Sequence, residues 1–158
     1  MKVQVKHSLK TDVGSLFKLC TEQKSQEAIY SKLGGSELKI RREGRAPLVR
    51  LKVSRRMPAN PPAAIRKLVP ATSDVAHSEQ WAADGKGYAA DIVVDIRGVP
   101  VKIIGTKILQ PEKGGCSVAW NFDVTSGIPL LGGLIASFAG EELKKNLEAE
   151  FSVLKTSV

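Results

Sequence analysis

The clearest candidates for chemistry are a histidine and a carboxylate two positions apart, His77 and Glu79. Alternate residues of a strand share one face, so this pair would lie beside Val75 and Trp81 on the same side of a strand. A buried histidine and carboxylate have shifted pKa values, and together they can act as an acid/base couple or orient a ligand. If this face is instead partly exposed near a strand end, they form an ordinary surface pair. His77 and Glu79 are therefore candidate catalytic residues only for an interior face, and catalysis otherwise stays unknown.

No other pattern indicates a particular reaction or a bound metal. His7 and His77 are the only histidines, and neither belongs to a hydrolytic or metal-binding motif. Cys20 and Cys116 lack the close Cys or His neighbours of a metal site, so we expect small core residues in a reducing environment. We predict neither a metal nor a cofactor.

Large apolar side chains are the candidates for a ligand-binding wall. Period-two alternation places Tyr88 and Ile92 on one face of a strand, and Trp120 and Phe122 on one face of another. These faces are predicted to point inward, where they form either plain core or the wall of an aromatic-lined cavity. The predicted ligand-binding residues are Trp81, Tyr88, Ile92, Trp120, Phe122, Leu131, Ile135 and Phe138.

A long amphipathic helix is predicted to close the chain, beginning near Ile128 and ending near Leu154. Its apolar residues recur at a mean spacing of about 3.7, which matches a helix period. At a rise of about 1.5 Å per residue, this helix would be roughly 40 Å long and would lie across a whole sheet. A sheet held by one such helix tends to leave a cavity, so binding of an apolar guest is the leading hypothesis.

The rest of the chain is predicted to form one sheet and two short helices. Strands are predicted over residues 2–9, 37–42, 48–55, 73–82, 86–97, 99–109 and 115–125, and helices over 13–20 and 25–33. The strand over 99–109 is apolar on both faces. Gly105 could mark a bulge that exchanges the two faces, which leaves the orientation of this strand open.

The whole chain has a net charge of +8, and its basic residues gather in one segment. Residues 39–67 hold ten basic side chains and a single acid, Glu43. They would form a solvated outer face that protects a sheet edge, or a surface that attracts an anionic headgroup, a membrane surface or RNA. No aromatic residue is interleaved there, which disfavours nucleic acid as a partner. The basic residues are Lys39, Arg41, Arg42, Arg45, Arg50, Lys52, Arg55, Arg56, Arg66 and Lys67.

Length and hydropathy indicate one globular domain, residues 1–158. The first residues alternate polar side chains with valine and lack the apolar block of a signal peptide. The longest apolar run, residues 127–140, is shorter than the roughly 20 residues of a membrane-spanning helix. We therefore expect a soluble, cytoplasmic protein; no pattern indicates its oligomeric state.

The order of the predicted elements resembles the helix-grip fold of the START-like (SRPBCC) superfamily, which includes polyketide cyclases and lipid-transport proteins. The chain is similar to a bacterial domain family of unknown function in that superfamily, through several short segments. They are Val5-Lys6-His7, Trp81-Ala82-Ala83-Asp84-Gly85, Gly98-Val99-Pro100, Gly105-Thr106 and Ile128-Pro129-Leu130-Leu131-Gly132-Gly133. The resemblance implies an α+β fold of order β-α-α-β6-α, with a curved seven-stranded antiparallel sheet around the C-terminal helix and an internal apolar cavity. It assigns no catalytic residue.

We therefore predict a START-like domain that binds or carries a hydrophobic small molecule, such as a lipid or an aromatic, polyketide-like metabolite. The first alternative is a cyclase or hydrolase that uses His77 and Glu79 in the same cavity. The second is an interaction module that binds nucleic acid or an anionic surface through the basic segment.

Overall fold

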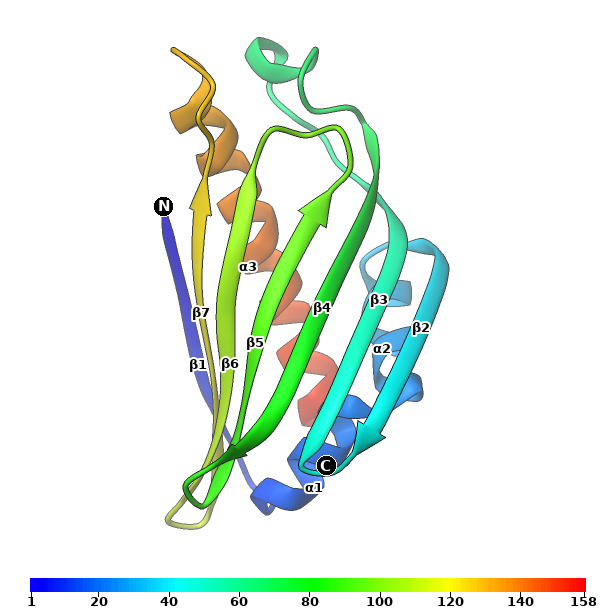
Figure 1. The fold of residues 1–158 in the computed structure, drawn as a ribbon, viewed down its shortest axis with the longest axis vertical. Coiled ribbons are helices and arrows are strands. Elements are labelled where there is room, and N and C mark those ends of the chain that lie inside the picture. Colours follow the sequence, from blue (N-terminus) through cyan, green and yellow to red (C-terminus); the bar gives the residue numbers. More distant parts are fainter.

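The computed structural model describes residues 1–158 as one curved antiparallel sheet with helices on its concave face (Figure 1). The strands are β1 (Lys2–Leu9), β2 (Ser36–Arg45), β3 (Leu48–Pro58), β4 (Thr72–Asp84), β5 (Gly87–Ile96), β6 (Lys102–Glu112) and β7 (Gly115–Thr125). The helices are α1 (Val13–Thr21), α2 (Gln23–Lys32) and α3 (Gly132–Thr156), and a short 3-10 helix, η1, spans Ala63–Ile65. The predicted α+β helix-grip fold is confirmed.

The strand order is β1-β7-β6-β5-β4-β3-β2, and every neighbouring pair is antiparallel. The closing helix α3 crosses the concave face, where it packs against β1, β7 and α2 (Figure 1). It therefore lies nearer one edge of the sheet than the other. The space beside it, over β3, β4 and β5, is where a cavity can form.

Alternation along the strands determines which side chains face the helices. On β7 every second residue from Cys116 to Val124 is buried, and on β3 the buried residues are Val49, Leu51, Val53 and Arg55. Helix α1 begins after Asp12, whose carboxylate accepts a hydrogen bond from the backbone N–H of Ser15 at 2.8 Å.

Gly105 does not form a bulge. The β5–β6 and β6–β7 registers run through it without a break, so Ile103, Lys107 and Leu109 all face inward. Gly105 lies opposite Phe122, and a Cβ atom at this position would collide with the backbone carbonyl of Asn121 and with the Phe122 ring. Glycine is therefore needed here to make room for a large aromatic side chain on the neighbouring strand.

The closing helix begins at Gly132 and not near Ile128. Leu130 has a φ of 66° and is fully exposed, so the chain between Ile128 and Leu131 is a turn. The apolar spacing extends into this turn because Ile128 and Leu131 pack against a small cluster around Ile65. Packing against the loop between β3 and β4, and not helical geometry, explains these two apolar residues.

We predict opposite effects of alanine at two glycines. Gly105→Ala should lower the free energy of unfolding by about 1–3 kcal/mol, because the added methyl group must displace both the Asn121 carbonyl and the Phe122 ring. Gly133→Ala, in the first turn of α3 with open space around it, should raise stability by roughly 0.5–1 kcal/mol. Urea unfolding of both variants measures the difference, and equal stabilities would contradict the close packing at Gly105.

Candidate functional site

A cavity of about 130 Å³ lies between the sheet and α3. Its apolar wall comes from β5, β6, β7 and the first half of α3, and includes Ile92, Ile103, Trp120, Phe122, Ile135 and Phe138. At its outer end Pro58 is exposed, and Glu142 and Asn146 of α3 are half-buried. The cavity therefore runs from a mouth between β3 and α3 into the centre of the domain.

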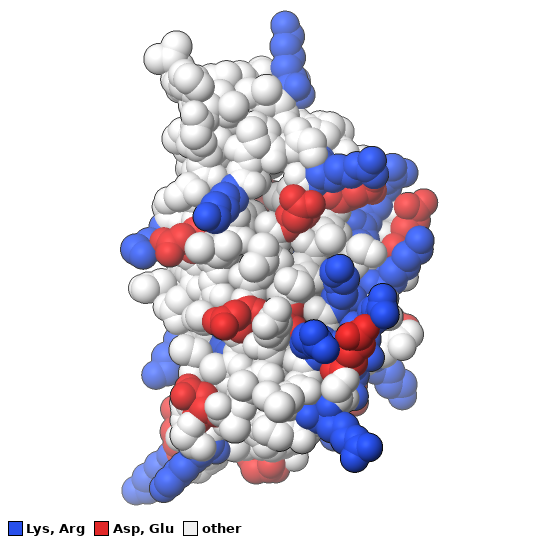
Figure 2. Space-filling view, in the orientation of Figure 1, with Lys and Arg blue, Asp and Glu red and all other residues white.

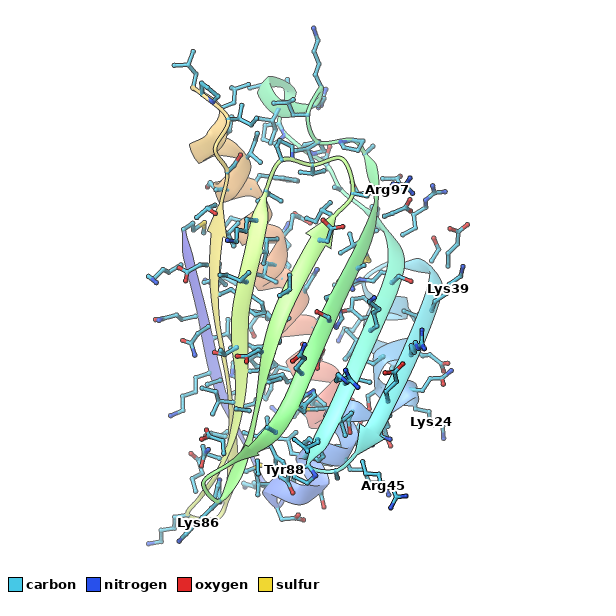
Figure 3. The ribbon with its side chains drawn as sticks, viewed as in Figure 1. Lys24, Lys39, Arg45, Lys86, Tyr88 and Arg97 are labelled. Atoms are coloured by element: carbon cyan, nitrogen blue, oxygen red, sulfur yellow. The ribbon has the colours of Figure 1, made fainter.

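The predicted lining residues divide into two groups. Five of them, Ile92, Trp120, Phe122, Ile135 and Phe138, line the cavity. The other three lie elsewhere: Trp81 and Tyr88 pack against Phe17 of α1, with ring centroids 5.4 and 4.0 Å away, and Leu131 joins the cluster around Ile65. Tyr88 lies near the end of the sheet beside α1 (Figure 3). A role of the five cavity residues in ligand binding stays a prediction.

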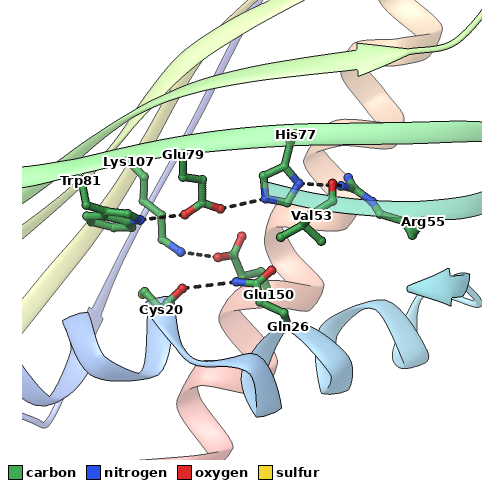
Figure 4. Close-up of polar contacts among 9 residues, drawn as sticks. All are labelled: Cys20, Gln26, Val53, Arg55, His77, Glu79, Trp81, Lys107 and Glu150. Atoms are coloured by element: carbon green, nitrogen blue, oxygen red, sulfur yellow. Dashed lines mark hydrogen bonds and ion pairs between the residues drawn. The ribbon is translucent and has the colours of Figure 1, made fainter. Parts of the chain in front are cut away.

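A row of polar side chains on β4 faces the interior (Figure 4). His77 Nε2 lies 2.8 Å from one oxygen of Glu79, and Trp81 Nε1 donates to the other oxygen at 2.9 Å. His77 and Glu79 are 6% and 5% exposed, which excludes an ordinary surface pair. Both oxygens of Glu79 are therefore engaged by neighbours on its own strand.

Arg55 of β3 determines the tautomer of His77. Its Nη1 lies 2.5 Å from His77 Nδ1, and because a guanidinium nitrogen can only donate, Nδ1 must be the acceptor. Nε2 then carries the hydrogen atom and donates a hydrogen bond to Glu79. With Nδ1 and Nε2 both occupied, His77 has no free lone pair for a substrate proton. This geometry does not favour the predicted acid/base role of His77 and Glu79.

The pKa values of this pair are shifted in the same direction. Burial lowers the pKa of His77 below its ordinary 6.5, and the nearby Arg55 charge adds to this effect. For Glu79 burial acts to raise the pKa, but the hydrogen bond from His77 and the Lys107 charge outweigh it and leave the pKa below 4.5. The pair is therefore a neutral histidine beside a carboxylate.

A buried ion pair connects the sheet to the closing helix. Lys107 of β6, 1% exposed, contacts the carboxylate of Glu150 on α3. Its ammonium group also lies 5.8 Å from the centre of the Trp81 ring and 5.4 Å from that of Trp120. Burial acts to lower the pKa of Lys107, but the carboxylates of Glu150 and Glu79 outweigh it and raise the pKa above 10.5. Lys107 is a cation and not a nucleophilic amine.

Two further groups beside this network keep their protons. Burial raises the pKa of the Cys20 thiol and of the Tyr30 hydroxyl to about 12 each. The Tyr30 ring stacks under the Arg55 guanidinium, 4.2 Å from its centre. Tyr30 therefore lines the cavity and Cys20 packs in the adjoining core, and neither is an activated nucleophile.

Four members of the site, Tyr30, Arg55, Lys107 and Glu150, were not predicted from the sequence. Arg55 was assigned to the basic face by its charge, but it shares the strand face of Val49, Leu51 and Val53 and is buried. The alternation of side chains along β6 could have identified Lys107 as inward-facing, because the tight β6–β7 turn pairs it with inward-facing Trp120. Glu150 follows buried Leu147 by three residues on the same helix face, which was a weaker signal.

The other basic residues of segment 39–67 are exposed. Figure 2 shows Lys and Arg gathered over β2 and β3 with several acidic side chains among them, and Figure 3 shows Lys39 and Arg45 along the β2 edge. Glu43 contacts Arg41 at 2.7 Å, and Asp74 contacts Arg56 at 3.3 Å. Binding of an anionic headgroup or membrane surface at this face stays a prediction.

No helix has both the length and the apolar character needed to cross a membrane.

The chain belongs to the DUF2505 family, described as a protein of unknown function, whose model matches residues 4–157. No curated protein matches it. The fold is similar to that of TTHA0849 from Thermus thermophilus, with 16% identity, a TM-score of 0.67, and 99% of this chain and 95% of that chain covered.

Two other solved structures share the fold. A STAR-related lipid transfer protein from Xanthomonas axonopodis is 12% identical with a TM-score of 0.61, over 98% of this chain and 83% of that chain. Ara h 8.0201 is 15% identical with a TM-score of 0.62, over 99% and 96%. Together with the seven-stranded sheet and closing helix, they place the chain in the START-like fold.

Removal of one member of the Lys107–Glu150 pair should be strongly destabilising. Lys107→Met leaves Glu150 without its cation and should lower the free energy of unfolding by about 3 kcal/mol. The double variant Lys107→Met/Glu150→Leu should recover most of this loss. Lys2→Met breaks the exposed contact with Asp123 and should cost less than about 1 kcal/mol in the same denaturant experiment. A double variant as unstable as the single one would contradict the pairing.

Acidification should destabilise the fold through His77. Because its pKa is lower in the folded state, the unfolded chain takes up the proton first, and stability falls as pH drops below about 6.5. Protonation of Glu79 also destabilises the fold, but only below about pH 4.5. Thermal unfolding between about pH 8 and pH 5.5 therefore reports on His77. His77→Gln should flatten this slope, and the control His7→Gln should keep it. An unchanged slope in His77→Gln would show that His77 is not buried in its neutral form.

Proposed function

We propose that the protein binds a hydrophobic small molecule in the cavity between the sheet and α3. The observation that carries this proposal is the cavity itself, whose walls are mostly apolar while a few polar groups converge at one side. This combination is typical of small-molecule sites, where apolar walls supply affinity and a few polar groups determine orientation. The STAR-related lipid transfer protein with the same fold supports this class of guest by analogy.

The cavity volume restricts the size of the guest. An engineered protein cavity of about 150 Å³ accepts benzene, and this cavity of about 130 Å³ is similar. A compact guest of about one ring fits the space as it stands, whereas a full-length lipid requires α3 or the loop between β3 and β4 to move away. The volume therefore favours the aromatic metabolite over the lipid among the predicted guests.

Occlusion of the cavity tests this function. Ala139 lines the cavity, whereas Ser137, two residues earlier on α3, is exposed. Toluene should raise the thermal unfolding temperature of the wild type and of the Ser137→Leu control. It should have little effect on Ala139→Leu, whose larger side chain occupies the space. Equal responses in all three proteins, or no response in any, would contradict binding in this cavity. Native mass spectrometry of the purified protein would identify a guest retained from the cell.

A further inference from the structure

Arg55 is a buried cation without a carboxylate partner. It is 6% exposed, and no acidic oxygen lies within 4.0 Å of its guanidinium group. The two carboxylates nearby have other partners, because buried Glu79 bonds to His77 and Trp81, and one oxygen of half-buried Glu150 bonds to Lys107. Neutral His77 and the Tyr30 ring stabilise the charge only in part. Burial of an unpaired charge is costly, so this position is complementary to an anion.

The fully buried side-chain atoms that lack a partner at the cavity are both donors. Arg55 Nη1 donates to His77 and to the Val53 carbonyl at 3.3 Å, but neither Nε nor Nη2 makes a hydrogen bond. The other buried polar side-chain atom without a partner is Trp120 Nε1, on the opposite wall. Both unpartnered buried atoms, Arg55 Nε and Trp120 Nε1, are therefore N–H groups. A ligand that satisfies these two atoms must bring acceptors.

The cavity separates its polar and apolar walls. Arg55, His77 and Ser73 lie on β3 and β4, with Tyr30 of α2 beside them, whereas β5, β7 and the first half of α3 contribute apolar side chains. Met57 and Pro58 line the outer part of the cavity, and Arg55 lies further inside, two residues before Met57 on the same strand. A guest that enters there can hold a charged end at Arg55 and direct its apolar body toward Phe122 and Phe138.

We propose that the guest is a small carboxylate with an apolar body of about one ring, and that Arg55 binds its carboxylate. A guanidinium group can give a carboxylate two parallel hydrogen bonds, here from Nη2 and Nε. Nε has no exposed surface, so the second bond requires a small rotation of the guanidinium plane. The inference rests on the proposed function and adds the charge and the orientation of the guest.

Phenylacetate and 2-phenylacetamide test the charge preference in the wild-type protein. The two probes have nearly the same shape and size, but only the acid is an anion at about pH 7. We expect phenylacetate to bind at least about tenfold more tightly by calorimetry, as charge-assisted hydrogen bonds are stronger than neutral ones. This comparison needs no variant and therefore does not depend on how any substitution folds.

Arg55→Gln tests the residue. It should reduce the affinity for phenylacetate to about that of the amide and leave the affinity for the amide nearly unchanged. Arg56→Gln is the matched control, because Arg56 is the next residue but points to the outer face and contacts Asp74. It should retain the preference for the acid. If Arg55→Gln fails to fold, Arg55→Lys keeps the charge without the two-pronged geometry and should show a reduced preference.

The outcomes separate this inference from the proposed function. Equal binding of acid and amide, or preference for the acid that survives Arg55→Gln, would overturn the carboxylate site while the cavity remains a binding site. Binding of toluene without binding of phenylacetate would do the same. If toluene, the acid and the amide all fail to bind, the proposed function itself is wrong.

Discussion

Charged side chains on the concave face of the sheet need partners, and this requirement organises the interior. Lys107 and Glu79 project from neighbouring parts of the sheet into a space enclosed by apolar residues, where an unpaired charge is costly. Glu150 supplies the partner of Lys107 from α3, and His77 and Trp81 supply hydrogen bonds to Glu79. The ion pair is also a positional constraint, because it joins the last third of α3 to the middle of β6.

The position of α3 explains where the cavity lies. The helix is held against β1 and β7 by apolar packing and against β6 by the ion pair, so it cannot also fill the space over β3, β4 and β5. Helix α2 closes part of that space from the other side with Tyr30, whose ring covers Arg55. The cavity is therefore a consequence of how the helix is attached, and its polar wall lies on β3 and β4, against which α3 packs less closely than against β1 and β7.

The fold could be predicted from the sequence because period-two alternation was clean on β5 and β7 and the helical period was sustained along α3. The site was harder, because its members interrupt the patterns that reveal the fold. Arg55 and Lys107 occupy inward positions of their strands but have the residue types of an outer face. Their charge therefore indicated exposure to solvent, whereas the alternation along each strand indicated burial. Strand β6 was ambiguous because Ile103, Ile104 and Ile108 give both faces an apolar character. Glu150 is only recognisable as interior once Lys107 is placed opposite it.

The fold alone does not determine what the cavity accepts, because structures with 12–16% identity share the same sheet and helix. The discriminating features are the side chains that interrupt an otherwise apolar interior. A methionine at position 55 would avoid the cost of burying this charge, but it would leave His77 Nδ1 without its hydrogen-bond donor. His77 accepts a hydrogen bond from only one nitrogen of Arg55, and the Tyr30 ring offsets only part of the Arg55 charge. An arginine left in this state is complementary to an anion that comes from outside the chain, which makes it the residue that most restricts the chemistry of the guest.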